Sequence, residues 1–332
     1  MSEQIIGAVQ ESGREKRERP LLEVKNLKKY FRVKSGLLHA VDDVSFTIDE
    51  GKTLGIVGES GCGKTTTGRA ILRLIEPTGG EINFDGVDIM KLSKSKLLLM
   101  RRHMQLIFQD PFSSLNPRKT VSEIIDEPLR LARMFTNSNE RFMRVVDLME
   151  TVGLAERFIN TYPHELDGGR RQRIGIARAL AMNPKFIVCD EPVSALDVSI
   201  QAQILNLMKE IQLETGVTYI FITHDLSVVN HFSDDIMVMY LGRAIEKAPA
   251  EELFENPMHP YTKALLSAVP LPNIHDRQER ILLRGEITSP INPEPVCRFA
   301  NRCNYSEGVC TKEEPRLKEV SPGHFVACHM VS

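Results

Sequence analysis

A glycine-rich segment near the start of the chain has the composition and spacing of a phosphate-binding loop. GESGCGKT, residues 58–65, fits G-x-x-x-x-G-K-[ST] and separates a short apolar run from an amphipathic one. Glycines let backbone N–H groups turn inward around an anion, and the following helix adds its positive dipole end. In such a loop the lysine contacts the β- and γ-phosphates, and the hydroxyl ligates Mg²⁺. The nucleotide-binding residues predicted here are Gly58, Glu59, Ser60, Gly61, Cys62, Gly63, Lys64, Thr65 and Thr66, with Thr65 also on Mg²⁺.

Cys62 occupies a variable position of this loop. Two interpretations stay open: the residue fills space, or it is an oxidation-sensitive thiol activated by the helix N-terminus.

An acidic pair later in the chain is the second element expected of a nucleotide site. FIVCDEP, residues 186–192, is an apolar run that ends in Asp190 and Glu191. Ligands of parallel sheets bind at the carboxyl ends of the strands. We expect Asp190 to hold Mg²⁺ through water and Glu191 to orient and polarise the attacking water. An apolar strand ending in Asp-Glu is common, but together with the phosphate loop it indicates nucleoside triphosphate hydrolysis.

The elements that must position these residues alternate between strands and helices. Apolar runs predict strands from Leu21 onward, where Val41, Val44, Phe46 and Ile48 alternate, and at 53–58, 79–86, 104–110, 185–192, 218–225 and 235–248. Helical spacing predicts a helix over 65–75 and an all-helical insertion over about 112–172. This order indicates an α/β fold with a mainly parallel sheet covered on both faces.

The chain divides into three parts by composition. Residues 1–20 mix charges without apolar periodicity and are expected to be a disordered tail. Residues 21–250 carry the strands and helices of an ATPase domain. Residues 251–332 are rich in proline and polar side chains and contain four of the six cysteines, which predicts a small C-terminal domain.

Charge and hydropathy exclude several classes of protein. The chain has 332 residues and a net charge of −2, which argues against a large uniform basic face for nucleic acid. No apolar run approaches the ~18–20 residues of a membrane span, and the polar start does not fit a signal peptide. We expect a cytosolic or peripherally membrane-attached protein, whose cysteines are metal ligands, reactive thiols or core residues rather than disulfides.

The segment PHELDGGRRQRIGIARAL, residues 163–180, resembles the signature segment of ABC-type ATPases. The resemblance implies a P-loop NTPase (RecA-like) core with an antiparallel β portion and an inserted α-helical subdomain. It further implies that Gln109 senses the γ-phosphate, that His224 contacts it, and that Tyr30 stacks on adenine, with Phe31 as the alternative. The implied signature residues are Leu166, Asp167, Gly168, Gly169 and Arg170, and the implied D-loop is Ser194, Ala195, Leu196 and Asp197.

Three further segments narrow the resemblance. Residues 58–74, 107–118 and 256–270 are similar to the oligopeptide/dipeptide importer ATPases, and within them to the F-type subunit. The resemblance implies ATP and Mg²⁺ as cofactors and a head-to-tail heterodimer with a D-type ATPase subunit. It also implies two membrane permease subunits as partners, and an extracytoplasmic peptide-binding protein that the chain serves only indirectly. It implies no nucleic acid partner and a peripheral position on the cytoplasmic face of the membrane. The alternatives are a nickel or other solute importer, a regulatory ATP-binding subunit without turnover, and a DNA-repair type ABC ATPase.

The signature departs from the family pattern at two positions, with Asp167 for the usual serine and Arg170 for the usual glutamine. An aspartate cannot donate a hydrogen bond to the γ-phosphate, and each like-charge pair at ~5 Å costs roughly 3 kcal/mol at an effective dielectric near 20. Arg170 could pair with Asp167 across one helical turn. We hypothesise two non-equivalent ATP sites; in the alternative, Asp167 is a harmless helix cap.

The spacing of the C-terminal cysteines, Cys297, Cys303, Cys310 and Cys328, is not that of a zinc ribbon and by itself leaves a metal site or unlinked thiols open. The family resemblance implies a [4Fe–4S] cluster, with Zn²⁺ as the alternative. Arg298, Arg302 and Lys312 are expected to offset the negative charge of such a site.

Overall fold

The computed structural model describes residues 19–269, 280–286 and 288–331. The tail expected over residues 1–20 therefore falls almost wholly outside the described residues.

A sheet of eight strands carries the predicted site, in the order β11-β12-β10-β9-β3-β8-β7-β6. Its parallel part comprises β3 (Thr53–Val57), β6 (Met104–Ile107), β7 (Phe186–Asp190), β8 (Thr218–Ile222) and β9 (Asp235–Tyr240). The remainder is antiparallel: β10 (Arg243–Pro249), β11 (Lys318–Ser321) and β12 (His324–Val326). Every residue of β3, β7 and β8 is buried, as expected for strands covered on both faces. The prediction of a mainly parallel sheet with an antiparallel portion is confirmed.

A second, antiparallel sheet has the order β2-β1-β4-β5 and is formed by β1 (Leu22–Val33), β2 (Gly36–Ile48), β4 (Gly79–Phe84) and β5 (Val87–Asp88). The predicted inward side chains Val41, Val44, Phe46 and Ile48 are buried. Between Val41 and Val44 the pairing with β1 slips by one residue, and Asp43 adopts a positive φ of 62° there. This bulge lets Asp42, a polar residue, be buried beside Val41.

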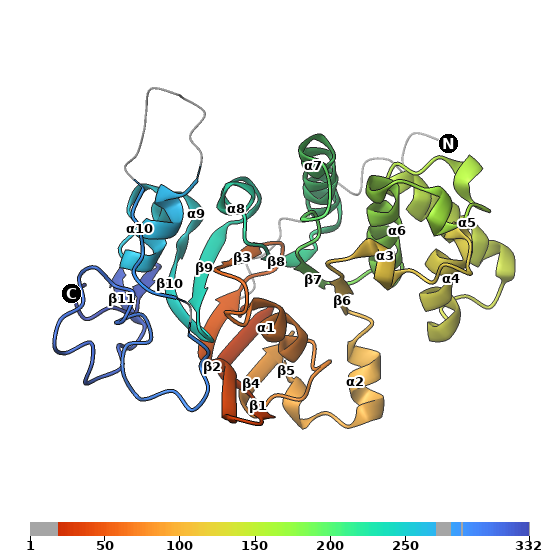
Figure 1. Cartoon of the computed structure of the whole chain (residues 1–332). Helices are drawn as coiled ribbons and strands as arrows, with labels where there is room; N and C mark the ends of the chain where they lie inside the picture. The colour runs from red at the N-terminus through yellow and green to blue at the C-terminus, as the bar shows by residue number, and fades with distance from the viewer. Residues whose placement is uncertain (1–18, 270–279, 287, 332) are drawn as a thin grey trace, which may run out of the picture.

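The helical insertion forms a lobe at one end of the molecule, and the C-terminal segment lies at the other end (Figure 1). The lobe contains α3 (Pro111–Ser114), α4 (Val121–Ala132), α5 (Ser138–Thr151) and α6 (Gly168–Leu180), with short 3₁₀ turns at Glu156–Phe158 and Pro163–Glu165. Thr120 and Glu123 form a capping box that fixes the start of α4. The insertion predicted over about 112–172 is helical, and its last helix, α6, extends beyond the predicted end to Leu180.

The other helices of the described residues lie outside the lobe: α1 (Lys64–Ile71), α2 (Lys94–Met100), α7 (Val198–Thr215), α8 (Leu226–Phe232), α9 (Ala250–Glu255) and α10 (Pro260–Ser267), with a 3₁₀ turn at Ile89–Lys91. The helix predicted over 65–75 ends early, at Ile71, because Arg73 adopts a left-handed conformation with φ 50°. Among the described residues, no helix has both the length and the apolar character needed to cross a bilayer.

Each face of the parallel sheet contributes to a different apolar cluster. In β7, Phe186 and Val188 pack into the cluster that contains α1 and the antiparallel sheet, whereas Ile187 and Cys189 pack into the cluster that contains the helical lobe. This division gives the coverage on both faces that the sequence predicts.

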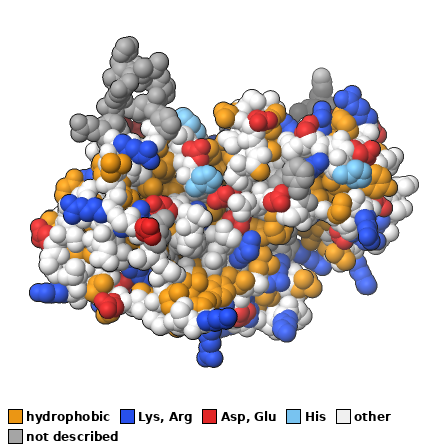
Figure 2. Space-filling view, viewed as in Figure 1, with side chains coloured by type: hydrophobic (Ala, Val, Ile, Leu, Met, Phe, Trp, Pro, Cys, Tyr) orange, Lys and Arg blue, Asp and Glu red, His pale blue; other side chains and the backbone are white. Residues whose placement is uncertain are grey.

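The C-terminal segment continues the main sheet, because β12 pairs with β10 through Glu246 and Lys247. The imidazole of His324 lies 2.8 Å from a carboxylate oxygen of Glu246, and both side chains are fully buried. Figure 2 shows Lys and Arg side chains interspersed with Asp and Glu over the visible face, in keeping with the net charge of −2.

Candidate nucleotide-binding site

The phosphate loop turns tightly between β3 and α1. Gly58, Gly61 and Gly63 have φ values of 146°, 79° and 105°. A Cβ atom at Gly63 would lie 2.1 Å from the carbonyl oxygen of Ala40, so only glycine fits this close approach. The Nζ of Lys64 donates hydrogen bonds to the carbonyl oxygens of Gly58 at 2.7 Å and Glu59 at 3.0 Å. The loop thus closes on the amino group of its own lysine.

The predicted magnesium ligands lie together at the carboxyl end of β7. The hydroxyl of Thr65 donates to Asp190 Oδ1 at 2.6 Å. Burial raises the pKa of Asp190, while the Thr65 hydrogen bond and the guanidinium of Arg69 act in the opposite direction. A hydroxyl and a carboxylate are hard oxygen donors of the kind that Mg²⁺ prefers, so this pair fits the ion.

Two predicted catalytic side chains, Gln109 and His224, converge on a third, Glu191. Glu191 follows β7, Gln109 follows β6, and His224 follows β8. Because β8, β7 and β6 are adjacent in the sheet, their ends meet. The amide of Gln109 donates to Glu191 Oε2 at 2.9 Å, and His224 Nδ1 lies 3.4 Å from Glu191 Oε1. Glu191 itself adopts a left-handed conformation with φ 47°, a strained geometry typical of functional positions.

Asp167 is the N-cap of α6. Its Oδ1 accepts the N–H of Arg170 at 2.8 Å, and its Oδ2 pairs with the guanidinium of Arg170 at 2.5 Å. Both features expected of this pair, the cap and the charge pairing across one helical turn, are therefore present. Leu166 is buried just before the cap.

The segment after β7 packs closely on the signature segment. Cβ atoms at Gly168 and Gly169 would lie 3.0 Å from Leu196 and 2.7 Å from Ile200, respectively. The hydroxyl of Ser194 donates to the carbonyl oxygen of Glu191 at 3.2 Å. The other predicted positions, namely Ser60, Thr66, Ala195 and Asp197, are exposed or half-buried.

Tyr30, predicted to stack on adenine, already has partners for both its ring and its hydroxyl. Its ring stacks on His39 with centroids 3.9 Å apart, and its hydroxyl donates to Asp42 at 2.5 Å. Although burial opposes it, hydrogen bonds from Tyr30 and His39 and the charges of two arginines hold the pKa of Asp42 at about 2. Phe31, the alternative, is 36% exposed and carries Lys29 Nζ 4.7 Å from its ring centroid.

Cys62 is buried, and burial raises the pKa of its thiol. These properties match the space-filling interpretation, since a reactive cysteine is an exposed thiolate.

All six cysteines lie in the described ranges and are free thiols. In the C-terminal segment, the N–H of Cys297 donates to the carbonyl oxygen of Cys310 at 3.0 Å. Burial, reinforced by the neighbouring cysteines, raises the pKa of Cys297 to about 11. Within the described part of the chain, however, no three His, Cys, Asp or Glu side chains are arranged to hold a metal ion. The side-chain arrangement does not support the expected [4Fe–4S] cluster or its Zn²⁺ alternative.

Two arginines of this segment face the ATPase core. The sequence analysis had instead expected them to offset the negative charge of a metal site. Arg298 donates to Asp42 and to the carbonyl oxygen of Leu241. Arg302 pairs with Glu59 of the phosphate loop at 2.6 Å. Sequence reasoning missed these contacts, because no local pattern signals a partner that lies 57 to 256 residues away.

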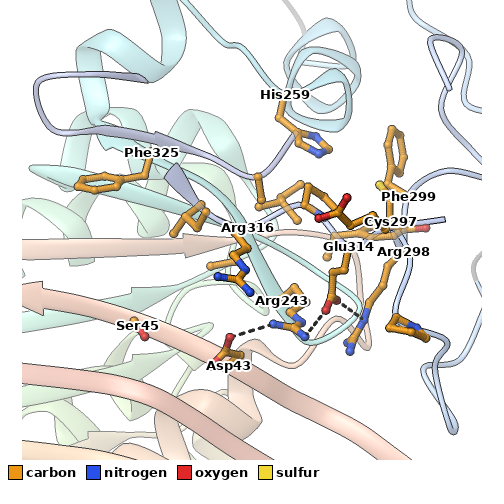
Figure 3. Close-up of a pocket in the computed structure, with 18 of the residues that line it drawn as sticks. Asp43, Ser45, Arg243, His259, Cys297, Arg298, Phe299, Glu314, Arg316 and Phe325 are labelled. Carbon is orange, nitrogen blue, oxygen red and sulfur yellow. Dashed lines mark hydrogen bonds and ion pairs between the residues drawn. The ribbon is translucent and has the colours of Figure 1, made fainter. Parts of the chain in front are cut away.

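A cavity of about 780 Å³ is lined on one side by the C-terminal segment and on the other by residues of β1, β2 and β10 (Figure 3). Arg243 spans it, pairing with Asp43 at 3.3 Å and with Glu314 at 2.7 Å, and Glu314 also faces Arg298 at 3.8 Å. None of the lining residues belongs to the phosphate loop. The cavity is therefore separate from the nucleotide site.

Comparisons with known proteins agree with this geometry. Residues 41–194 match the family model described as ABC transporter, and residues 245–310 match the one described as oligopeptide/dipeptide transporter, C-terminal region. Over 322 residues the chain is 53% identical to the oligopeptide transport ATP-binding protein AppF of Bacillus subtilis (strain 168), covering 94% of this chain and 98% of that protein. The chain belongs to the ABC transporter ATPase family.

This ABC ATPase is also 53% identical to the oligopeptide transport ATP-binding protein OppF of Bacillus subtilis (strain 168), covering 93% of this chain and 96% of that protein. Among solved structures, the dimer of the ATP-binding cassette MJ0796 in a post-hydrolysis state, bound to ADP and Pi, superposes with a TM-score of 0.64. It is 33% identical and covers 69% of this chain and 98% of that one. The predictions of a P-loop NTPase fold and of an ABC ATPase are confirmed.

Proposed function

We propose that this ABC ATPase hydrolyses ATP to energise the import of oligopeptides or dipeptides through a membrane transporter. The observation that carries the proposal is the convergence of Gln109 and His224 on Glu191, directly beside the Thr65–Asp190 pair. The matched C-terminal region and the two relatives named as oligopeptide transport proteins supply the substrate class.

The site performs phosphoryl transfer by positioning and charge neutralisation. The phosphate loop binds the phosphates through its N–H groups, and Lys64 exchanges its two carbonyl partners for phosphate oxygens. Thr65 and Asp190 would hold Mg²⁺, which would supply further neutralisation of the phosphate charge. Glu191 orients and polarises the attacking water, and His224 contacts the γ-phosphate.

Phe31 is the better candidate for the ring that stacks on adenine. The Tyr30 ring is covered by His39 and its hydroxyl is held by Asp42, whereas the Phe31 ring is more than a third exposed on the opposite side of the strand.

In this proposal the chain packs head to tail with a second, D-type ATPase subunit, and each ATP lies between the phosphate loop of one subunit and the signature helix of the other. The dimeric cassette with ADP and Pi among the similar structures supports such pairing. Closure on ATP and reopening after hydrolysis convert the nucleotide state into motion.

The two ATP sites of the heterodimer are proposed to be non-equivalent. The site completed by the signature of this chain presents Asp167 where a hydroxyl donor is usual, and Arg170 occupies both carboxylate oxygens of Asp167. We assign slow turnover to that site and full turnover to the site that contains Lys64 and Glu191.

Through its helical lobe the chain is proposed to contact a helix of one of the two membrane permease subunits. Phe108, directly before Gln109, is 42% exposed, and Leu131 and Met134 at the end of α4 are 74% and 40% exposed. Exposed apolar side chains of this kind mark interaction surfaces. A permease helix seated there would receive motion from Glu191 through Gln109, which places the chain peripherally on the cytoplasmic face of the membrane. The extracytoplasmic peptide-binding protein then acts only indirectly.

On the family resemblance of Cys297, Cys303, Cys310 and Cys328 alone, we propose a [4Fe–4S] cluster in the C-terminal segment, with Zn²⁺ as the alternative. No step of the ATPase mechanism depends on it. Anaerobic purification with iron, sulfide and zinc analysis tests it. Preparations free of all three refute both metals.

The proposed function is tested by reconstitution of the transporter in liposomes with labelled peptides and with nickel as a competing solute. We expect ATP-dependent peptide uptake and peptide-stimulated ATPase activity. Nickel uptake without peptide uptake would refute the peptide assignment while leaving the ATPase assignment intact.

A further inference from the structure

Glu59, the second residue of the phosphate loop, is held from two sides by the C-terminal segment. Arg302 grips its carboxylate with both ends of the guanidinium, Nη1 to Oε2 at 2.6 Å and Nη2 to Oε1 at 3.0 Å. The backbone N–H of Glu59 donates to the hydroxyl of Tyr261 at 2.9 Å. Side chain and backbone of this one loop residue are thus fixed by residues far along the chain.

Both contacts have the geometry of strong, specific interactions. A two-point arginine–carboxylate pair fixes direction as well as distance. Arg302 is 8% exposed and Tyr261 is fully buried, so water competes little for either contact. Tyr261 also lies in the first turn of α10, where His259 Nδ1 accepts the N–H of Tyr261 at 3.1 Å and orients the start of the helix.

Glu59, which the clamp formed by Arg302 and Tyr261 holds in place, also contacts the lysine of the loop. The carbonyl oxygen of Glu59 is one of the two that accept a hydrogen bond from Lys64 Nζ. Fixing Glu59 therefore fixes an anchor of Lys64. The loop needs such support, because its positive-φ glycines at 58, 61 and 63 give it more conformations to lose when it binds phosphate.

We propose that Arg302 and Tyr261 are positioning residues that preorganise the phosphate loop through Glu59 and thereby set its affinity for nucleotide. The inference rests on the proposed function, since it assumes that residues 58–65 bind ATP. A preorganised loop pays less ordering entropy on binding. Loss of the clamp therefore weakens nucleotide binding and leaves the chemical step, which depends on Glu191, largely unchanged. Because Cys303 directly follows Arg302, the cysteine region is connected to the phosphate loop through the Arg302–Glu59 pair.

The test uses the full-length chain and titration with MgADP, which binds without turnover. Tyr261→Phe removes only the hydroxyl that accepts the Glu59 N–H, and Arg302→Lys keeps the charge but loses the two-point grip. We expect each to weaken MgADP binding roughly five- to tenfold. The matched control is Tyr219→Phe, a second buried tyrosine whose hydroxyl donates to the carbonyl oxygen of Met208 at 3.3 Å, away from the loop. It should change MgADP binding less than twofold.

A double-variant cycle separates positioning from simple stabilisation. Arg302→Met alone leaves the Glu59 carboxylate unpaired, so adding Glu59→Gln should restore part of the lost affinity. In the assembled transporter, Tyr261→Phe should raise the KM for ATP with little change in kcat. The inference is overturned if Tyr261→Phe and Arg302→Lys lower the melting temperature yet bind MgADP as the wild type does. A wild-type chain that binds no MgADP would instead refute the proposed function.

Discussion

The side-chain amide of Gln109 donates a hydrogen bond to Glu191 Oε2 at 2.9 Å, joining the end of β6 to the end of β7. Gln109 also lies two residues before α3, where the chain enters the helical lobe. The carboxylate proposed to polarise water and the lobe proposed to contact the permease are therefore one hydrogen bond apart. In this proposal, a change at the γ-phosphate moves the lobe without any long relay of side chains.

Glu191→Gln should abolish ATP turnover while ATP binding persists, since the amide cannot act as a base. We expect a loss of roughly 10²–10⁴-fold in kcat. ATPase activity of the assembled transporter and nucleotide binding by the full-length chain measure the two effects. Glu210→Gln on the exposed face of α7 makes the same chemical change away from the site and serves as the control. Turnover near the wild-type rate in Glu191→Gln would remove Glu191 from the mechanism.

Replacing Asp167 by Ser together with Arg170 by Gln should raise the ATPase rate of the transporter about twofold, because a second site would begin to turn over. The matched control is Asp88→Ser with Lys91→Gln. Asp88 likewise caps a short helix through the N–H of Met90 and pairs with Lys91 at 2.7 Å. If the signature variant hydrolyses ATP at the wild-type rate, Asp167 acts only as a helix cap.

Tyr30 and Phe31 are the two candidates for the ring that stacks on adenine, and substitutions distinguish between them. Phe31→Ala should weaken ATP binding by about tenfold, within the range of base–aromatic stacking. Tyr30→Phe should leave ATP binding unchanged and lower the stability of the fold, because it removes the hydrogen bond to Asp42. Titration with ATP and with a triphosphate lacking a base separates stacking from phosphate binding. A Phe31→Ala chain that binds ATP normally would return the role to Tyr30.

Acid should destabilise the fold through His259. Burial lowers the pKa of His259 from 6.5 to about 3, so the folded state keeps the imidazole neutral. The unfolded chain takes up this proton below about pH 6.5, and the free energy of unfolding then falls by up to ~1.4 kcal/mol per pH unit until about pH 3. His259→Asn keeps a helix-capping residue but cannot titrate. Denaturation curves at pH 7 and pH 5 should show a smaller loss for the variant. Equal losses would exclude His259 as the cause.

Local patterns and the family resemblance together predicted which side chains lie near one another at the proposed nucleotide site. The strand runs ending in Gln109, Glu191 and His224 place these side chains at one sheet edge, because parallel strands align their carboxyl ends. The spacing of Asp167 and Arg170 likewise predicted both the cap and the charge pair. These features depend on periodicities of a few residues.

Long-range contacts could not be predicted in this way. Nothing near Glu59 in the sequence points to Arg302 or Tyr261, and the helix after the phosphate loop ends early because of a backbone turn at Arg73. Tyr30 and Phe31 are equally aromatic in sequence. Only the pairing of β1 with β2, which sets Tyr30 opposite His39, shows which ring is already covered.

Peptide uptake by the assembled transporter carrying Lys64→Ala tests the account most directly, because Lys64 binds two carbonyl oxygens of the phosphate loop and is proposed to contact the phosphates. Lys96→Ala, an exposed lysine on α2, is the control. The account predicts that Lys64→Ala lowers ATP-driven uptake by about 10²-fold or more, whereas Lys96→Ala transports normally. Uptake at the wild-type rate with Lys64→Ala would contradict it.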